Sequence, residues 1–281
     1  MHFTKYSGLG NDFVFLDGLT AKAVKDPFSL ARKICDRRDG VGADGLILLL
    51  PSAKADVKMR IINADGSEAE MCGNASRCVP LHLHLMGQTQ KKLITLETLA
   101  GLIKTEIVDE KKQLVRVNMG TPKLLRGQIP MTGNPEEPAQ NIALKLRTQS
   151  VTGTGVSMGN PHFVIFTDDI SDFNVTALGP KIENHSAFPQ KTNVEFVQII
   201  SPQHVRMRVW ERGVGITRAC GTGACAAAVA TILQGGLLCT NEVRVQLDGG
   251  DLLIEWPDHR DIFMTGPAQQ TFTGDFNYDP L

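Results

Sequence analysis

The sequence predicts an α+β protein of two pseudo-symmetric domains, each a mixed or antiparallel β-sheet wrapped around a central α-helix. The segments EAEMCGNASRC and ITRACGTGACA each place a cysteine, Cys72 or Cys220, just before a glycine and a helix-like run. Strand-like runs surround both segments in the same order, and strands outnumber helices in each half. A chain of 281 residues is long enough for two domains, each with its own core.

The similarity between the halves begins near the start of each. Three further pairs of segments correspond: GNDFVF (10–15) with GNPHFVI (159–165), GADGL (42–46) with KTNV (191–194), and KMRII (58–62) with RMRVW (206–210). Because these matches and the two cysteines keep one order at an almost constant offset, they indicate an internal duplication. The offset is far too long for a solenoid repeat.

The second part of each half is predicted as a helix followed by a hairpin. Both helices are expected to stop at a glycine, Gly87 or Gly235, since glycine favours the C-terminal end of a helix. Residues 93–107 and 243–256 both have the pattern strand, glycine-containing turn, strand. The irregular stretch 119–138, which contains four prolines, is the expected region of the domain boundary.

Composition excludes several classes of protein. Charged residues make up 21% of the chain and the net charge is −1, so nothing points to nucleic acid or an anionic membrane surface. No run is long and apolar enough to span a bilayer, and the N-terminus lacks the pattern of a signal peptide. Six scattered cysteines without a CxxC pair fit reduced thiols. We therefore expect a cytoplasmic protein without a membrane partner.

The position of Cys72 and Cys220 before a helix suggests chemistry. Unpaired N–H groups and the helix dipole at a helix N-terminus favour a thiolate and bind a carboxylate. If the halves meet about an approximate two-fold axis, the two thiols face one another across a cleft. One thiolate could then remove a proton from the carbon beside a bound carboxylate, while the opposite thiol returns one and inverts the centre. Core positions are expected for the other cysteines, Cys35, Cys78, Cys225 and Cys239.

These segments resemble a known family. NADGSEAEMCGNASRC, MGNPHFV, TNVEF and ERGVGITRACGTGACAAAVA, with KYSGLGNDFVFLD at the start, resemble the diaminopimelate epimerase family in order over essentially the whole chain. The resemblance implies interconversion of LL- and meso-2,6-diaminopimelate in lysine and peptidoglycan biosynthesis, without metal, pyridoxal phosphate or other cofactor. It also implies a cytoplasmic homodimer, an active site in the interdomain cleft, and domains of residues 1–118 (with 263–281 packing back) and 119–262.

The resemblance also assigns roles by position. It implies that Cys72 and Cys220 are the acid and base, that His162 and Glu211 tune the thiols, and that no residue binds a metal. The substrate-binding residues that it implies are Asn11, Asn63, Gly73, Asn74, Asn160, Asn193, Glu211, Arg212, Gly221 and Thr222. The glycines, Asn74 and Thr222 would act through backbone amides. The chain departs from the family pattern at Gly45, Ala75 and Ile216.

Other interpretations remain open at this point. GTGACA (221–226), with Asp248 further on, fits a loose dinucleotide-binding pattern, although no strand leads directly into its first glycine. Cys78, His82 and His84 suggest a metal site but offer few ligands. A cysteine hydrolase using Cys220 and His162, an amino-acid-binding module, and a racemase for another amino acid complete the alternatives.

Overall fold

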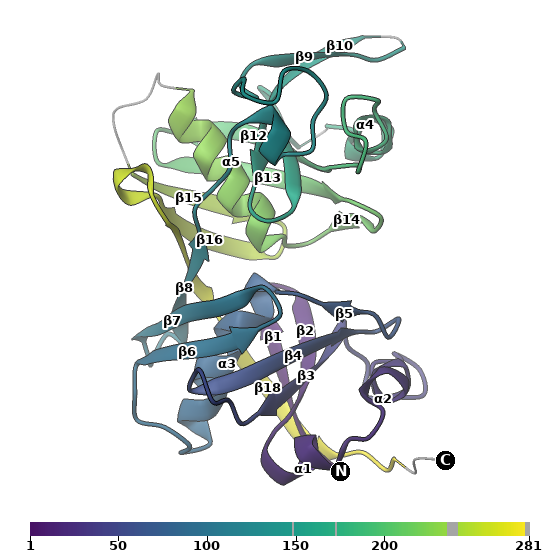
Figure 1. Cartoon of the computed structure of the whole chain (residues 1–281), viewed down its shortest axis with the longest axis vertical. Helices are drawn as coiled ribbons and strands as arrows, with labels where there is room; N and C mark the ends of the chain where they lie inside the picture. Colours follow the sequence, from purple (N-terminus) through teal and green to yellow (C-terminus); the bar gives the residue numbers. More distant parts are fainter. Residues whose placement is uncertain (148, 172, 235–240, 279–281) are drawn as a thin grey trace. The chain divides into compact units, whose positions relative to one another are not determined.

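A computed structural model describes residues 1–147, 149–171, 173–234 and 241–278. The chain forms two compact units, Met1–Asn118 with Thr265–Leu281, and Met119–Met264 (Figure 1). The chain passes from one unit to the other within two strands, β8 (Leu114–Gly120) and β17 (Ile262–Pro267). Within the described residues, no helix has both the length and the apolar character needed to cross a bilayer.

The first unit consists of a sheet and three helices. Its remaining strands are β1 (His2–Gly8), β2 (Asn11–Leu16), β3 (Gly45–Leu50), β4 (Val57–Asn63), β5 (Glu68–Ala69), β6 (Leu93–Thr98), β7 (Gly101–Asp109) and β18 (Gln269–Asp275). Its helices are α1 (Gly18–Ala23), α2 (Pro27–Ile34) and α3 (Gly73–Leu85). Strands pair in the order β18-β1-β2-β3-β4-β6-β7-β8, with β5 also on β4. The pairs β2–β3 and β4–β6 are parallel and the others antiparallel.

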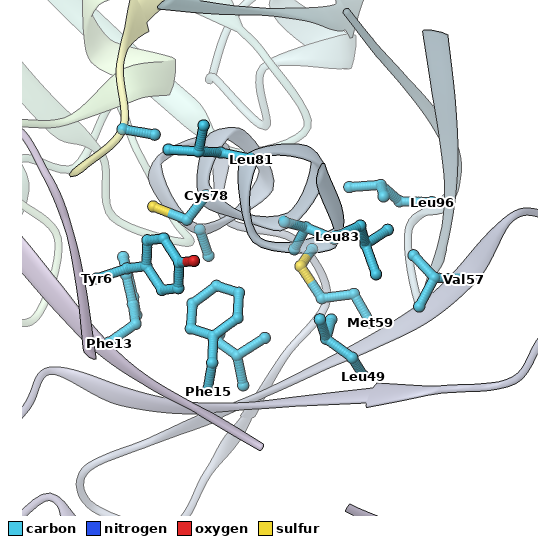
Figure 2. Close-up of a cluster of buried hydrophobic side chains, with 14 of the residues drawn as sticks. Tyr6, Phe13, Phe15, Leu49, Val57, Met59, Cys78, Leu81, Leu83 and Leu96 are labelled. Atoms are coloured by element: carbon cyan, nitrogen blue, oxygen red, sulfur yellow. The ribbon is translucent and has the colours of Figure 1, made fainter. Parts of the chain in front are cut away.

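Helix α3 is the centre of this unit. It is buried from Gly73 to Leu83 and contacts β1, β7 and β18. Aromatic rings from β1 and β2, including Tyr6 and Phe15, pack against the helix beside Cys78 (Figure 2). A helix enclosed on most sides needs apolar or small residues around its whole circumference, which is why α3 lacks a strongly polar face.

The second unit repeats the architecture. Its remaining strands are β9 (Ile142–Lys145), β10 (Ser150–Ser157), β11 (Pro161–Phe166), β12 (Asn193–Ser201), β13 (His204–Glu211), β14 (Gly215–Thr217), β15 (Glu242–Leu247) and β16 (Gly250–Glu255). Its helices are α4 (Val175–Glu183), α5 (Gly221–Leu233) and two short 3₁₀ helices, Arg126–Gln128 and Pro257–His259. Helix α5 is the central one: it contacts β10, β11, β12, β13, β15 and β16.

The strand pairings show the duplication directly. The order β1-β2-β3-β4-β6-β7 in the first unit corresponds to β10-β11-β12-β13-β15-β16 in the second, with parallel pairs at the same two places. The short strand β14 pairs with β13 as β5 pairs with β4. Helices α3 and α5 each have 13 residues. The predicted fold class, two related domains with a sheet around a central helix, is confirmed.

The predicted helix ends and hairpins can be compared in turn. Gly87, at φ +67°, follows the C-cap residue of α3, as expected for a glycine that ends a helix. Gly235 and Cys239 lie outside the described residues. The two predicted hairpins are β6–β7 and β15–β16. The buried positions expected for Cys35, Cys78 and Cys225 are confirmed.

Candidate active site

Each central helix begins immediately after a cysteine. Cys72 is the N-cap residue of α3 and Cys220 that of α5, both with extended backbones (φ −141°, ψ 114° and φ −125°, ψ 110°). At such a position the first N–H groups of the helix have no intrahelical acceptor. Sγ of Cys220 accepts one of them, from the Gly223 amide at 3.3 Å. The amides of Gly73, Asn74, Gly221 and Thr222 belong to these first turns and are suited to hold an anion.

The surroundings of Cys220 oppose its ionisation. Its side chain is buried, and burial together with the carboxylates of Glu211 and Glu195 raises the pKa of the thiol well above its ordinary value. Hydrogen bonds from Thr222 and the Gly223 amide act in the other direction and are outweighed. The expectation that the helix terminus lowers the pKa is therefore wrong for Cys220. Desolvation of a charge is a larger effect than one or two stabilising hydrogen bonds.

A chain of polar contacts leads from the interior of the second unit to Cys220. His162 on β11 and Glu195 on β12 have fully buried side chains, with Nδ1 and Oε1 2.7 Å apart. Nε2 of His162 is 3.0 Å from Oδ1 of Asn160, and Nδ2 of Asn160 donates to Oγ1 of Thr222 at 3.3 Å. Oγ1 of Thr222 is 3.5 Å from Sγ of Cys220.

The predicted residues at the ends of β12 and β13 also lie together. Nδ2 of Asn193 donates to the Pro161 carbonyl at 2.8 Å, and its Oδ1 accepts from the Arg212 backbone amide at 2.9 Å. The exposed Arg212 side chain donates to the Gln190 carbonyl at 3.1 Å. Glu211 accepts from the Thr217 hydroxyl. This group therefore offers an exposed guanidinium and a carboxylate near Cys220.

In the first unit, Asn11 and Asn74 contact one another across β2 and α3. Nδ2 of Asn74 donates to Oδ1 of Asn11, and Nδ2 of Asn11 donates to Oδ2 of Asp44 at 3.0 Å. Asn63 lies at the end of β4, and its Nδ2 donates to Ser67 Oγ at 2.9 Å. Cys72 is partly exposed at the start of the same helix.

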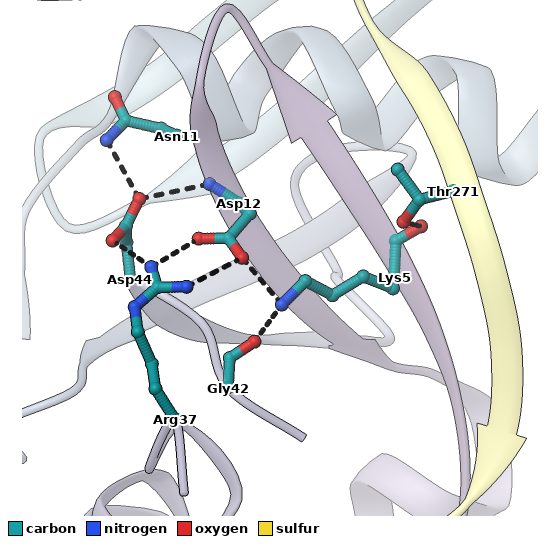
Figure 3. A network of polar contacts seen from close by, with 7 residues as sticks. All are labelled: Lys5, Asn11, Asp12, Arg37, Gly42, Asp44 and Thr271. Carbon is teal, nitrogen blue, oxygen red and sulfur yellow. Dashed lines mark hydrogen bonds and ion pairs between the residues drawn. The ribbon is translucent and has the colours of Figure 1, made fainter. Parts of the chain in front are cut away.

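An ionic network supports Asn11 (Figure 3). Asp12 forms ion pairs with Lys5 (2.7 Å) and Arg37 (2.8 Å), and Arg37 also reaches Asp44 at 2.8 Å. Burial alone would raise the pKa of Asp12, but the hydrogen bonds and charges of Arg37 and Lys5 outweigh it and lower that pKa. The network fixes Asp44, the acceptor for the Asn11 side chain.

Sequence reasoning missed Glu195 and this ionic network. The signal for Glu195 was an acidic residue within the otherwise apolar run Val194–Val197. Such a residue in a buried strand needs a partner, because an unpaired buried charge is very costly. Its partner is His162, 33 residues away in the sequence.

The structure separates the alternatives. Cys78 and His82 have other partners: Sγ of Cys78 contacts the Asn74 carbonyl, and His82 contacts Tyr6 and Asp17. Across the described ranges, no three His, Cys, Asp or Glu side chains gather as a metal site requires. Both ring nitrogens of His162 contact groups other than Cys220, unlike the base of a cysteine hydrolase. Three residues separate β14 from the first glycine of α5, unlike a dinucleotide-binding turn.

The three departures from the family pattern have local explanations. Ala75 lies inside α3, has no positive φ, and is fully buried in the core around that helix. Gly45 pairs with Phe13 and Asn63 on the neighbouring strands. Ile216 is an exposed residue of β14. Each residue therefore fits its backbone without strain.

The fold defines a class of two-domain proteins. A hydroxyproline epimerase from Agrobacterium vitis has a TM-score of 0.66 and 16% identity, covering 98% of this chain and 91% of that one. A phenazine biosynthesis protein of the PhzF family from Bacillus anthracis also has a TM-score of 0.66, with 17% identity and 99% coverage of both chains. At these identities the likeness shows a shared fold.

Sequence comparison gives the family. The model of the family described as diaminopimelate epimerase matches residues 3–125 and 154–271. The diaminopimelate epimerase of Desulforudis audaxviator (strain MP104C) is 54% identical over 276 residues, covering 98% of each chain. That of Pelotomaculum thermopropionicum is 51% identical over 285 residues, covering 99% of each. The chain belongs to the diaminopimelate epimerase family, as the resemblance of its motifs predicted.

Proposed function

We propose that this protein interconverts LL- and meso-2,6-diaminopimelate by a two-base mechanism that uses Cys72 and Cys220. The observation that carries the proposal is the equivalent placement of the two cysteines, each capping the central helix of one half of a duplicated fold. Membership of the diaminopimelate epimerase family supplies the substrate. One thiolate removes the α-proton and the opposite thiol donates a proton to the other face, which inverts the carbon.

The mechanism requires the two helix N-termini to face one another across the bound substrate, in a cleft between the domains. The amides of Gly73, Asn74, Gly221 and Thr222 would then hold the carboxylate beside the reacting carbon. They would stabilise the negative charge that develops there as the proton leaves. Such stabilisation in a water-excluded site is commonly the largest single contribution to catalysis.

The remaining polar residues would select the substrate. Arg212 would pair with the distal carboxylate and Glu211 with an ammonium group, since opposite charges with hydrogen bonds recognise a zwitterion best. The amides of Asn11, Asn63, Asn160 and Asn193 would complete these contacts. His162 and Glu211 would tune the thiols.

The two thiols would differ before the substrate binds. The raised pKa of Cys220 keeps it protonated and therefore suited to act first as the acid. Cys72, which is partly exposed at its helix terminus, would act first as the base. When the substrate has the opposite configuration at the reacting carbon, the two thiols exchange these roles.

We also propose the cellular setting that the family resemblance implies. The enzyme would act as a cytoplasmic homodimer, without metal or organic cofactor, in lysine and peptidoglycan biosynthesis. Full activity after treatment with EDTA and with hydroxylamine is the expected result. Loss of activity that zinc or pyridoxal phosphate restores would contradict this part of the proposal.

The test of function is a substrate comparison. Purified protein is incubated with LL-diaminopimelate, and in parallel with L-glutamate and L-proline, and the stereoisomers are separated by chiral chromatography. We expect meso-diaminopimelate from the first substrate and no inversion of the other two. Faster inversion of glutamate or proline would identify a racemase for another amino acid.

A further inference from the structure

The second unit contains a buried ion pair that the proposed chemistry does not explain by itself. Glu195 and His162 both have 0% side-chain exposure, and Oε1 of Glu195 is 2.7 Å from Nδ1 of His162. The other oxygen, Oε2, is buried and lacks a hydrogen-bond partner among the described residues. The contact with His162 is therefore what compensates the buried carboxylate, and a charged partner compensates it best.

Both ring nitrogens of His162 face acceptors. Nδ1 faces the Glu195 carboxylate, and Nε2 faces Oδ1 of Asn160 at 3.0 Å. A neutral imidazole has one N–H and can satisfy one such contact, whereas an imidazolium donates from both nitrogens. The geometry is that of a charged His162 held between Glu195 and Asn160.

This arrangement gives the rest of the chain a direction. With Oδ1 of Asn160 accepting from His162, its Nδ2 donates to Oγ1 of Thr222 at 3.3 Å. The hydroxyl oxygen of Thr222 is then an acceptor, so its hydrogen is left to point at Sγ of Cys220, 3.5 Å away. Every link donates toward the thiol, and a donor aimed at sulfur favours the thiolate.

Cys72 has no equivalent of this ion pair. His162 pairs with Asn193 on the parallel neighbour strand as Phe13 pairs with Gly45, and Glu195 pairs with Val164 as Ile47 pairs with Phe15. The residues that correspond to His162 and Glu195 are therefore Phe13 and Ile47. Both of these lie in the hydrophobic core around α3.

We propose that Glu195 is a positioning residue for Cys220: by holding His162 in its charged form, it orients Asn160 and Thr222 so that the Thr222 hydroxyl donates to Sγ. The proposal rests on the catalytic role proposed above for Cys220. It assigns a function to Glu195 and to the Thr222 side chain, and it makes the two thiols unequal by construction. The orientation assists Cys220 in the half of the cycle in which it acts as the base.

The test transplants the apolar pair of the first unit into the second. The double variant His162→Phe with Glu195→Ile preserves the type of packing seen at Phe13 and Ile47. The pH profile of alkylation by iodoacetamide is measured for Cys220 and Cys72 in the same sample, by peptide mass spectrometry. The groups facing Cys220 are Glu211, Glu195 and the chain through His162; the double variant changes the last two.

We expect the midpoint for Cys220 to rise by about one pH unit, a roughly ten-fold loss of thiolate at a given pH, with Cys72 unchanged. Thr222→Val should raise the midpoint similarly, Thr222→Ser should keep the wild-type value, and the triple variant should show no further rise. A Glu195 that acted as an uncompensated negative charge would give the opposite sign, since its own charge raises the pKa of Cys220.

A fall or no change in the Cys220 midpoint, or additive shifts in the triple variant, would overturn the proposal. Glu183→Gln is the control, because Glu183 is another buried carboxylate of the second unit that accepts from Trp210 and Gly213. It should leave the midpoint unchanged. If the double variant does not fold, the Thr222→Val and Thr222→Ser pair still decides the direction of the last link. The alkylation needs no substrate, so it can fail while the diaminopimelate assay succeeds, and the reverse.

Discussion

The two halves share a backbone plan but surround their cysteines with different charges. In both, an asparagine that follows glycine, Asn11 or Asn160, contacts the second residue after the cysteine, Asn74 or Thr222. In the first half the asparagine is held by the partly exposed network around Asp12 and Asp44. In the second it is held by a fully buried His162–Glu195 pair.

This difference teaches which features the duplicated fold keeps. The register of the strands and the N-cap position of the thiol are the same in both halves, because they position the reacting group. The supporting charges differ, since any arrangement that fixes the asparagine serves the same end. A two-base enzyme needs two thiols in equivalent places, but it does not need them to have equal acidity.

The largest effect is expected from removing either thiol. Cys72→Ala and Cys220→Ala should each lower kcat/KM for both LL- and meso-diaminopimelate by on the order of 10²–10⁴-fold. Both directions fall together because one variant lacks the base for one isomer and the acid for the other. Calorimetry should still detect substrate binding, since the proposed carboxylate contacts are backbone amides. Cys225→Ala, a buried core cysteine on α5, is the control and should keep activity within about three-fold.

A smaller effect is expected from exchanging the small residues behind the thiols. A Cβ on Gly223 would lie 2.8 Å from Oε1 of Glu195 and 3.2 Å from Sγ of Cys220. Gly223→Ala should therefore displace the thiol and lower kcat/KM by roughly ten- to a hundred-fold. The matched change in the first half, Ala75→Gly, should cost about 1 kcal/mol of stability and leave activity within about three-fold. Equal losses in the two variants would refute the asymmetry.

The smallest effect concerns stability. Asp12→Asn should lower the free energy of unfolding by about 1–2 kcal/mol at pH 7, because it weakens charged hydrogen bonds with Lys5 and Arg37. The pKa of Asp12 is lowered on folding, so its contribution is present above the unfolded value of about 4 and is lost as the pH falls through the folded value. Urea titrations of both proteins between pH 7 and pH 3 should converge at the acid end.

The control for this stability measurement is Asp275→Asn. Asp275 is exposed and contacts the exposed His2. Its replacement should change stability by less than about 0.5 kcal/mol at every pH. A constant difference between wild type and Asp12→Asn across the pH range would argue against an ionic role for Asp12.

Local pattern was enough to predict much of the fold and the thiols. The cysteines precede glycine and small residues, and the hairpins have glycine in their turns, so each signal lies within a few residues. Glu195 could not be paired with His162 in this way, because their contact depends on the register between two parallel strands. The raised pKa of Cys220 likewise depends on burial and on carboxylates from two other strands. Effects that arise from non-local packing are not visible in a motif.

The account depends most on proton transfer by two different groups, and one measurement tests this directly. Wild-type protein is incubated with LL-diaminopimelate in deuterium oxide, and the first meso product formed is analysed by mass spectrometry. A two-thiol mechanism predicts deuterium at the inverted α-carbon of essentially every product molecule, because the donating thiol exchanges with solvent before the substrate binds. A single-base mechanism would return the substrate's own proton to part of the product. Early product that retains the original hydrogen at that carbon would contradict the account.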